Sequence, residues 1–374
     1  MNKTVICLGA GYNQIQYIKE LKKRKYDVIC VDKTKNSPGF KFCTQKIISS
    51  THDYTKTPFI IKKLVKKDVN IVGAIAPTTG NPYKTLQEIK KIYNLNYLHK
   101  KKYNLLLDKK MMRQRLNKLG CSKISIVNYN KINDKNFQPI VIKPRFGGSG
   151  SKDIKIILNY KDFKKNLSEI KKDKFIVEEM VKGKELAGDL IWADGTFKFI
   201  NIGWHLFNKK TNEIVGATSQ KIDRKIFDQF KRKVKKVCKN FGLDKEVINI
   251  DAIVDIKKNI HIIEIEFVPH EGIFLGDNCF NYNLVKNYVS CYLSEPIDAQ
   301  FSRKKEAFVS VIDTRFSKKK ENQNLEKFHY HKNLKKKKNT PSKPNFIGIS
   351  CSKPDKIEKI LKDFFKDLVV ERSL

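Results

Sequence analysis

The stretch that most constrains the fold alternates apolar and polar residues twice within a short span. It covers residues 249–272, and its sequence is NIDAIVDIKKNIHIIEIEFVPHEG. The alternating runs are residues 251–255 and 261–267, and the polar residues 257–259 separate them. A period of two over beta-branched residues, interrupted by a short polar turn, predicts two strands of a hairpin.

The predicted hairpin carries three acidic residues that can share one face. Side chains two residues apart on a strand point the same way, so Glu264 and Glu266 lie together, and Asp251 on the partner strand can reach them. Carboxylates beside apolar side chains need a proton or a cation, and a hard cation such as Mg2+ prefers oxygen ligands. The alternative at this point is a solvated strand face paired with surface lysines.

A glycine-rich segment follows a predicted strand at residues 140–144, and its sequence continues VIKPRFGGSGSKDIKII. Lys143 lies near the end of this strand, and residues 147–151 can wrap backbone N–H groups around phosphate oxygens. The segment lies between two strands, unlike a P-loop, which opens into a helix. An ordinary hairpin with a glycine tip is the alternative.

A second acidic segment follows a short apolar strand at residues 175–177. Glu178 and Glu179 end this strand, and Glu185 follows a glycine turn. The backbone of such a turn can hydrogen-bond the edge of an adenine, and a carboxylate can accept from ribose hydroxyls.

The N-terminus has the pattern of a strand–helix–strand unit. Residues 4–11 form a predicted strand with a GxG turn, followed by a helix over 14–23 and a strand over 26–31. Gln14 stands where the dinucleotide fingerprint requires its third glycine, so NAD binding is not predicted. The loop at residues 77–80 follows another strand and is either a ligand contact or a simple turn. Periodicity predicts further elements in this order: helix 59–67, strand 71–76, helix 83–93, helix 100–119, strand 124–127, strand 154–157, strands 186–192 and 196–202, and helix 226–241.

Composition limits the class of protein. The chain has 374 residues, enough for two or three structural units, and its net charge is +38. The excess is mostly lysine spread along every segment, alongside abundant Ile and Asn, as in chains shaped by an AT-rich coding bias. Specific nucleic-acid binding is therefore not favoured. No apolar run is long enough to span a bilayer, and the first residues do not have the pattern of a signal peptide. We expect a cytoplasmic protein.

Taken together, these motifs resemble the ATP-grasp superfamily, which includes carbamoyl-phosphate synthase, biotin carboxylase and the ATP-dependent carboxylases of purine synthesis. The resemblance lies in the order of four segments: Asp108-Lys109 before a helix, VIKPRFGGSGSK, VEEMVKGKE, and the hairpin with EIEFVPH. It implies an α/β chain with an ATP-grasp fold, α+β in its ATP-binding part.

The resemblance also implies a division into three parts. Residues 1–98 would form a Rossmann-like pre-ATP-grasp domain, residues 99–299 the ATP-grasp domain, and residues 300–374 a C-terminal strand–helix segment. In the last part we expect a strand over 307–312, a Lys-rich exposed loop over 317–345, a strand over 346–351 and a helix over 354–368.

Residue roles follow from the resemblance position by position. It implies that ATP, with Mg2+ or Mn2+, is the cofactor. The catalytic residues would be Lys143, Arg145 and His270. The ATP contacts would be Lys109, Lys143, Gly147, Gly148, Ser149, Gly150, Ser151, Glu178, Glu179, Met180, Val181 and Glu185. The metal ligands would be Asp251, Glu264 and Glu266.

The last motif departs from the common family pattern EINPR. If Glu264 is the anchor, Glu266, Phe267 and Val268 replace Asn, Pro and Arg. If Glu266 is the anchor instead, Val268 replaces Asn. The first register keeps three oxygen ligands and is favoured. Asp153 also replaces a glycine that is usual after the phosphate loop.

The resemblance implies an ATP-dependent carboxylate–amine or carboxylate–thiol ligase that works through an acyl phosphate and releases ADP and phosphate. Its partners would be a small carboxylate and an amine or other nucleophile, and monomer and homodimer are both compatible with the sequence. Two other readings are an ATP-binding protein without turnover and a nucleic-acid-binding protein. Candidate substrate contacts are His205, Arg224, His270, Asn278 and Asn281.

Overall fold

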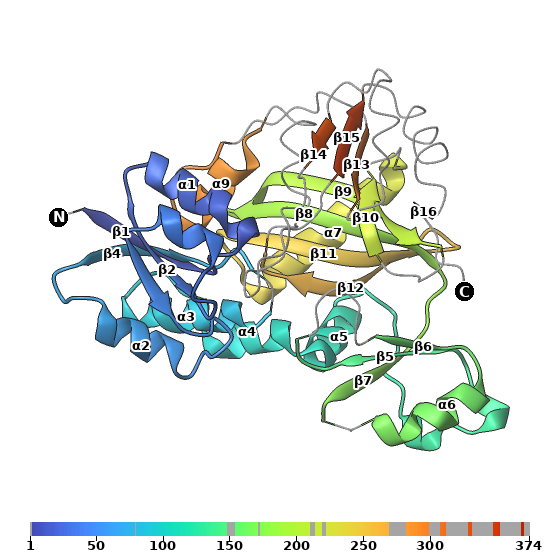
Figure 1. The fold of residues 1–374 in the computed structure, drawn as a ribbon. Helices are drawn as coiled ribbons and strands as arrows, with labels where there is room; N and C mark the ends of the chain where they lie inside the picture. Colours follow the sequence, from blue (N-terminus) through green and yellow to red (C-terminus); the bar gives the residue numbers. More distant parts are fainter. Residues whose placement is uncertain are drawn as a thin grey trace.

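The structure is a computed structural model that describes most of the chain. The described residues are 2–78, 80–147, 154–170, 173–209, 214–218, 222–268 and 282–298, and the strands at 307–311, 328–330, 347–351 and 368–369. Within these residues the elements form a small parallel sheet at the N-terminus, a three-stranded sheet and a large antiparallel sheet (Figure 1).

The N-terminal part is a parallel sheet with helices on both faces. Its strand order is β3-β2-β1-β4, and helices α1 and α9 lie on one face, with α2 and α3 on the other (Figure 1). The nearly continuous apolar strands explain this arrangement, since strands buried on both faces need cover on both. The strands are β1 (Lys3–Leu8), β2 (Asp27–Asp32), β3 (Gln45–Ile48) and β4 (Asn70–Ile75), and the helices are α1 (Ile15–Lys23), α2 (Thr57–Leu64), α3 (Pro82–Ile92) and α9 (Leu284–Leu293).

The glycine turn after β1 is filled by the chain's own side chain. The Gln14 side chain packs against Gly9 and Gly11, and its amide donates to the carbonyl of Pro77 at 2.7 Å. Gln14 therefore ties the turn after β1 to the loop after β4.

The predicted single helix over 100–119 is wrong, because two helices occupy this region. They are α4 (Lys100–Leu107) and α5 (Lys109–Lys118). Asp108 between them is extended, and its carboxylate accepts hydrogen bonds from the backbone N–H groups of Lys110 and Met111. This N-cap starts a new helix and places Lys109 at its first position.

A three-stranded sheet forms a separate lobe with its own core. Its order is β6-β5-β7, with β5 (Ile140–Pro144), β6 (Lys155–Ile157) and β7 (Phe175–Glu179). Helix α6 (Tyr160–Asn166) covers it through Phe163. The predicted strand over 124–127 is wrong, because only an isolated bridge from Ile126 to Glu178 forms there.

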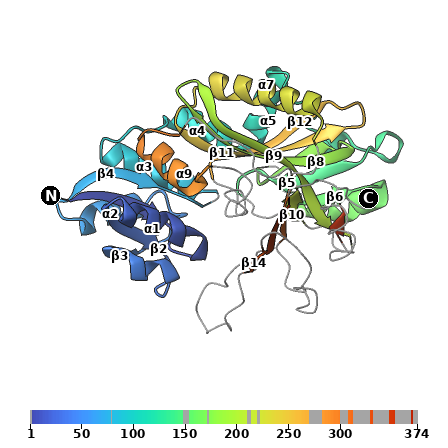
Figure 2. The same cartoon turned by 90° about the horizontal axis from the view of Figure 1, so that it is seen from above.

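The large sheet has the order β12-β11-β8-β9-β10-β13-β15-β14, with β16 paired to β9. Its long helix, α7 (Arg224–Phe241), lies against one face (Figure 2). Phe230 of α7 packs so closely on Gly188 that a Cβ there would collide with its ring. The strands are β8 (Gly183–Ala193), β9 (Thr196–Asn208), β10 (Ile214–Thr218), β11 (Glu246–Asp255), β12 (Ile260–Glu266), β13 (Ala307–Val311), β14 (Phe328–Tyr330), β15 (Ile347–Cys351) and β16 (Leu368–Val369).

The C-terminal predictions have a mixed outcome. Strands at 307–311 and 347–351 are confirmed and pair with each other. Part of the predicted Lys-rich loop is instead a strand, β14, which pairs with β15. The predicted helix over 354–368 lies outside the described residues, apart from Leu368, which belongs to β16.

Candidate active site

The acidic hairpin forms as predicted, with a register that brings its carboxylates together. Asp251 of β11 stands directly opposite Glu264 of β12, and Asn249 stands opposite Glu266. The register shifts next to Asp251, so Ile263 is an extra residue on β12. Such a bulge re-aims neighbouring side chains. The hairpin therefore presents Asp251 and Glu264 side by side.

His205 of β9 reaches one of these carboxylates, Asp251. Its Nε2 lies 3.1 Å from Oδ1 of Asp251, across β8, where Ala187 is the register partner of Asp251. The other candidate substrate contact in this region, Arg224, is almost fully exposed at the start of α7 and pairs with Asp228. The structure thus places His205, but not Arg224, at the acidic hairpin.

Lys109 connects helix α5 to the acidic hairpin and to the glycine segment. Its Nζ lies 2.8 Å from Oε1 of Glu264 and donates to the carbonyl of Gly147 at 3.0 Å. A predicted phosphate ligand, a predicted metal ligand and the first glycine of the predicted phosphate loop therefore meet at one ammonium group.

Lys143 is held in a buried cluster behind this point. Its Nζ lies 2.8 Å from Oε2 of Glu178, and the other oxygen, Oε1, accepts from Nε of Arg113 at 2.7 Å. Burial by itself raises the pKa of Glu178, but the Lys143 ammonium and the Arg113 guanidinium outweigh it and hold the pKa below its ordinary value. Glu178 is therefore an ionised, buried carboxylate between two cations.

Arg113 also reaches the backbone of the acidic hairpin. One terminal nitrogen donates to Oγ of Ser122 at 2.9 Å and to the carbonyl of Ile262 at 2.5 Å. The other donates to the carbonyl of Ile263 at 2.9 Å. Arg113 is fully buried, so it joins the small sheet, through Glu178, to the bulge of β12.

Arg145 is positioned by the N-cap of α5. Its guanidinium makes a bidentate contact with Asp108, with Nε–Oδ1 at 3.0 Å and Nη2–Oδ2 at 2.7 Å. Its carbonyl accepts from the backbone N–H of Lys109. Burial raises the pKa of Asp108, but hydrogen bonds from Arg145 and from the helix N-terminus lower it overall. This contact fixes the end of β5 against the start of α5.

The segment after β7 is already partly committed to internal hydrogen bonds. The backbone N–H of Glu179 donates to the carbonyl of Ser125, and that of Met180 donates to the carbonyl of Pro139. Glu179, Met180, Val181 and Glu185 are partly exposed. For an incoming adenine, the N–H of Met180 is therefore already occupied.

Several predicted site residues cannot be placed. Gly148, Ser149, Gly150, Ser151, His270, Asn278 and Asn281 lie outside the described residues. In the part of the chain that the structure describes, no group of three or more His, Cys, Asp or Glu side chains is arranged to hold a metal ion. The three-carboxylate metal site stays a prediction.

The sequence analysis did not single out Arg113. A signal was available, because residues four apart share a helix face and Arg113 follows Lys109 by four positions. Its partners come from distant parts of the chain, so its role depends on the tertiary fold.

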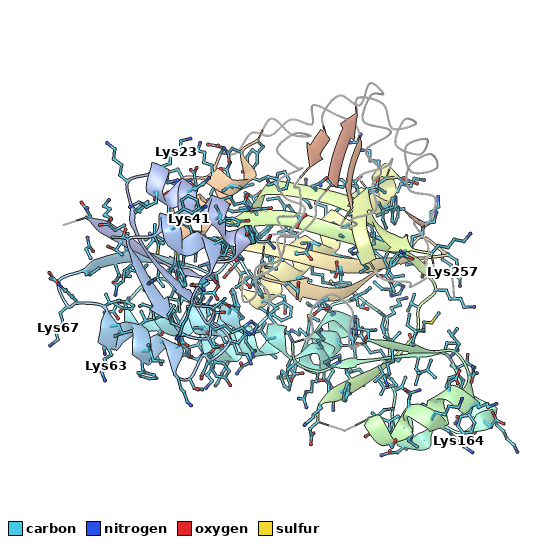
Figure 3. All side chains as sticks on the ribbon, in the orientation of Figure 1. Lys23, Lys41, Lys63, Lys67, Lys164 and Lys257 are labelled. Carbon is cyan, nitrogen blue, oxygen red and sulfur yellow. The ribbon has the colours of Figure 1, made fainter. Side chains whose placement is uncertain are left out.

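The positive charge is spread over the surface. Labelled lysines project from the N-terminal part, from α6 and from the turn of the acidic hairpin: Lys23, Lys41, Lys63, Lys67, Lys164 and Lys257 (Figure 3). Among the described residues, no helix is long and apolar enough to cross a bilayer.

Comparisons with known proteins agree on one fold. Residues 136–277 match the family model of the ATP-grasp domain, and no curated protein matches the chain. Among solved structures, phosphoribosylglycinamide synthetase from Anaerococcus prevotii is 19% identical, with TM-score 0.74 and 99% of each chain covered.

Two further structures resemble the chain over nearly its whole length. An L-amino acid ligase from Bacillus licheniformis is 12% identical, with TM-score 0.78 and 98% of each chain covered. An N5-carboxyaminoimidazole synthetase from Staphylococcus aureus, complexed with ADP, is 14% identical, with TM-score 0.76 and 96% of each chain covered.

Proposed function

We propose, from the premise that this chain contains an ATP-grasp domain within an ATP-grasp fold, that it is an ATP-dependent carboxylate–amine ligase. The observation that carries the proposal is the meeting of Lys109, Gly147 and Glu264 at one ammonium group. A cation, a glycine backbone and a carboxylate from three separate elements are the groups that a nucleotide phosphate and its metal require.

The solved structures that share the fold support this proposal. One is named an L-amino acid ligase, one is a synthetase complexed with ADP, and one is a biotin carboxylase complexed with a nucleotide. We propose the reaction class that the sequence resemblance implies, in which ATP activates a carboxylate to an acyl phosphate and becomes ADP. An amine then displaces phosphate, so that ADP and phosphate leave. A thiol is the alternative nucleophile. We also propose a cytoplasmic location.

We propose Mg2+ or Mn2+ as the metal. Asp251 and Glu264 stand opposite each other in the hairpin and offer the oxygen atoms that these hard cations prefer. When bound, the metal would neutralise charge on the phosphates. We assign Asp251 and Glu264 as its ligands and keep Glu266, which lies two residues further on β12, as a third.

The chain's own residues would position the phosphates and offset their charge. Lys109 and Lys143 present compact charges for a group that becomes more negative during transfer. His205 holds the orientation of Asp251 through its 3.1 Å contact. Glu179, Val181 and Glu185 are the partly exposed groups available to the base and ribose.

Nucleotide binding without turnover is the second candidate function. It is favoured by Val268, which replaces the Arg of the common family motif if Glu264 is the anchor, and whose neighbour Phe267 stacks on Tyr83 with ring centroids 4.4 Å apart. Val268 is apolar and buried, so it cannot offer a charge to a transferred phosphate.

The deciding experiment is ADP release from MgATP across a panel of amino acids and small carboxylic acids. We expect acceptor-dependent ADP release that falls by roughly 100-fold or more in Glu264→Gln. The matched control is Asp228→Asn, which removes an acid on α7 that pairs with the exposed Arg224, and its activity should match the unmodified protein. Nucleotide binding without ADP release for any acceptor would favour the second candidate.

A further inference from the structure

Glu178 has more cationic partners than a simple ion pair requires. One oxygen is bonded to Lys143 and the other to Arg113, at 2.8 Å and 2.7 Å. All three side chains are almost completely buried, with side-chain exposures of 3%, 0% and 4% for Lys143, Arg113 and Glu178. The cluster therefore contains one positive charge in excess.

The excess charge matters when a nucleotide enters. Lys143 is a proposed phosphate ligand, yet in this structure its ammonium is bonded to Glu178. To reach a phosphate it must weaken or leave that contact. A buried carboxylate that loses its only partner is strongly destabilising, so an isolated Lys143–Glu178 pair would hold the lysine back.

Arg113 removes this penalty. Its Nε contact with Glu178 does not involve Lys143. Its two terminal nitrogens donate to the Ser122 hydroxyl and to the carbonyls of Ile262 and Ile263. It cannot follow Lys143 toward a phosphate, because four acceptors on three segments hold its planar fork in place.

We infer that Arg113 is a positioning residue: it stays as the second counter-ion of Glu178 and thereby releases Lys143 to bind a nucleotide phosphate. The inference rests on the proposed function and adds to it a residue that contacts no substrate itself. A purely structural role for Arg113, as a strut between the two sheets, is the competing explanation.

The two explanations differ in how substitutions combine. In Arg113→Met, Glu178 keeps Lys143 as its only cationic partner in the cluster, so affinity for a non-hydrolysable ATP analogue with magnesium should fall by on the order of 10-fold or more. Adding Glu178→Gln to this variant removes the carboxylate that retains Lys143, and most of the lost affinity should return. If Arg113 only connects the two sheets, the double variant should bind the ATP analogue no better than Arg113→Met alone.

Conservative variants separate charge from hydrogen bonding. Arg113→Lys cannot reproduce the forked hydrogen bonds of the guanidinium, but it keeps a positive charge beside Glu178. Because the charge is what releases Lys143, the inference predicts near-normal affinity for the nucleotide. Arg113→Gln keeps donors for the carbonyls but loses the charge, so it should behave like Arg113→Met and replaces it if that variant does not fold. Arg115→Met is the matched control on α5. Arg115 donates to the side chain of Asn240 on the surface, away from Glu178, and this variant should bind normally.

Isothermal titration of these variants decides the question, with folding checked by circular dichroism. Restored affinity in Arg113→Met with Glu178→Gln, or in Arg113→Gln with Glu178→Gln, supports the inference. Normal affinity in both neutral single variants, or no restoration in either double variant, overturns it while leaving the proposed function intact. No nucleotide binding by the unmodified protein overturns both.

Discussion

Lys109 and Lys143 have the same proposed task but are held in different ways. Lys143 lies in a buried cluster whose carboxylate has a second cation, Arg113. Lys109 is bonded to Glu264, whose side chain is 22% exposed, and to a backbone carbonyl at the start of the glycine segment. Lys143 is therefore positioned by the buried interior of the fold. Lys109 is positioned by Glu264 and Gly147, which the metal and the phosphates are proposed to contact.

This difference between the two lysines shows how a binding site can keep cationic side chains in position before a ligand binds. A buried carboxylate fixes a lysine firmly but releases it only if another charge remains behind. A partly exposed carboxylate holds a lysine weakly, because water can replace the contact. We expect Lys143 to set the position of the phosphates and Lys109 to exchange its partner when the metal binds to Glu264.

The largest expected difference between the two carboxylates is in stability. Glu178→Ala leaves two buried cations without their partner and should lower the free energy of unfolding by about 3–5 kcal/mol. Glu264→Ala breaks one partly exposed pair and should cost about 1 kcal/mol or less. Chemical denaturation of both variants measures these changes. Equal losses of unfolding free energy would contradict the proposed difference between Glu178 and Glu264.

The pH dependence of stability should identify Glu178 directly. Its pKa is lowered in the folded protein from an ordinary value of 4.5, so its contribution is present above about pH 4.5 and is lost as the pH falls through the folded pKa. Glu178→Gln should remove this part of the acid dependence of the free energy of unfolding. If the variant and the unmodified protein lose the same free energy of unfolding between pH 6 and pH 3, Glu178 is not the group responsible.

Binding of magnesium-free ATP should separate the two lysines. Without a metal, the Glu264 carboxylate repels phosphates and retains Lys109. Glu264→Gln should therefore bind magnesium-free ATP more tightly, by roughly 3- to 10-fold, although it loses turnover. Titrations with a chelator present measure this. Weaker binding would mean that Lys109 is not a phosphate ligand.

A third carboxylate, Glu246, should have the smallest effect on stability, and that effect should depend on pH in the opposite direction to the effect of Glu178. Tyr83 donates to Glu246 at 2.8 Å, and burial raises the pKa of Glu246 to about 7, against the opposing influence of Lys90 and Tyr83. A raised pKa makes this group cost stability as the pH rises from about 4.5 to about 7.

In Glu246→Gln, stability at pH 8 relative to pH 5 should therefore increase, by about 1 kcal/mol, because Glu246 is only partly buried and the remaining solvent contact screens part of the effect. Thermal unfolding at the two pH values checks this. A decrease would show that Glu246 is instead stabilised by its partners, as Glu178 is.

The hairpin was predictable because strand periodicity and turn chemistry are local. Alternation placed Glu264 and Glu266 on one face, and the observed register adds Asp251 to them. The four motifs also predicted the fold. The helix over 100–119 failed because its apolar pattern continues through Asp108, whose capping role outweighs it.

The partners of Glu178 were not predictable from local pattern. Its position at a strand end indicated an adenine contact, but both of its oxygens are occupied by cations from α5 and β5. Pairing of buried charges depends on which elements meet in the folded chain, and one sequence does not show that. The same holds for β14, a short strand that forms only because β15 offers it an edge.

Helix α9 has a consequence for the order in which the protein is made. Leu293 packs on Gly73 of β4 so closely that a Cβ at Gly73 would collide with it, and Glu295 accepts hydrogen bonds from Arg24 and Tyr26. The first sheet is thus covered by residues synthesised long after its strands. We expect a nascent chain stopped before Leu284 to leave one face of this sheet exposed to chaperones, and its folding to finish only when α9 has left the ribosome.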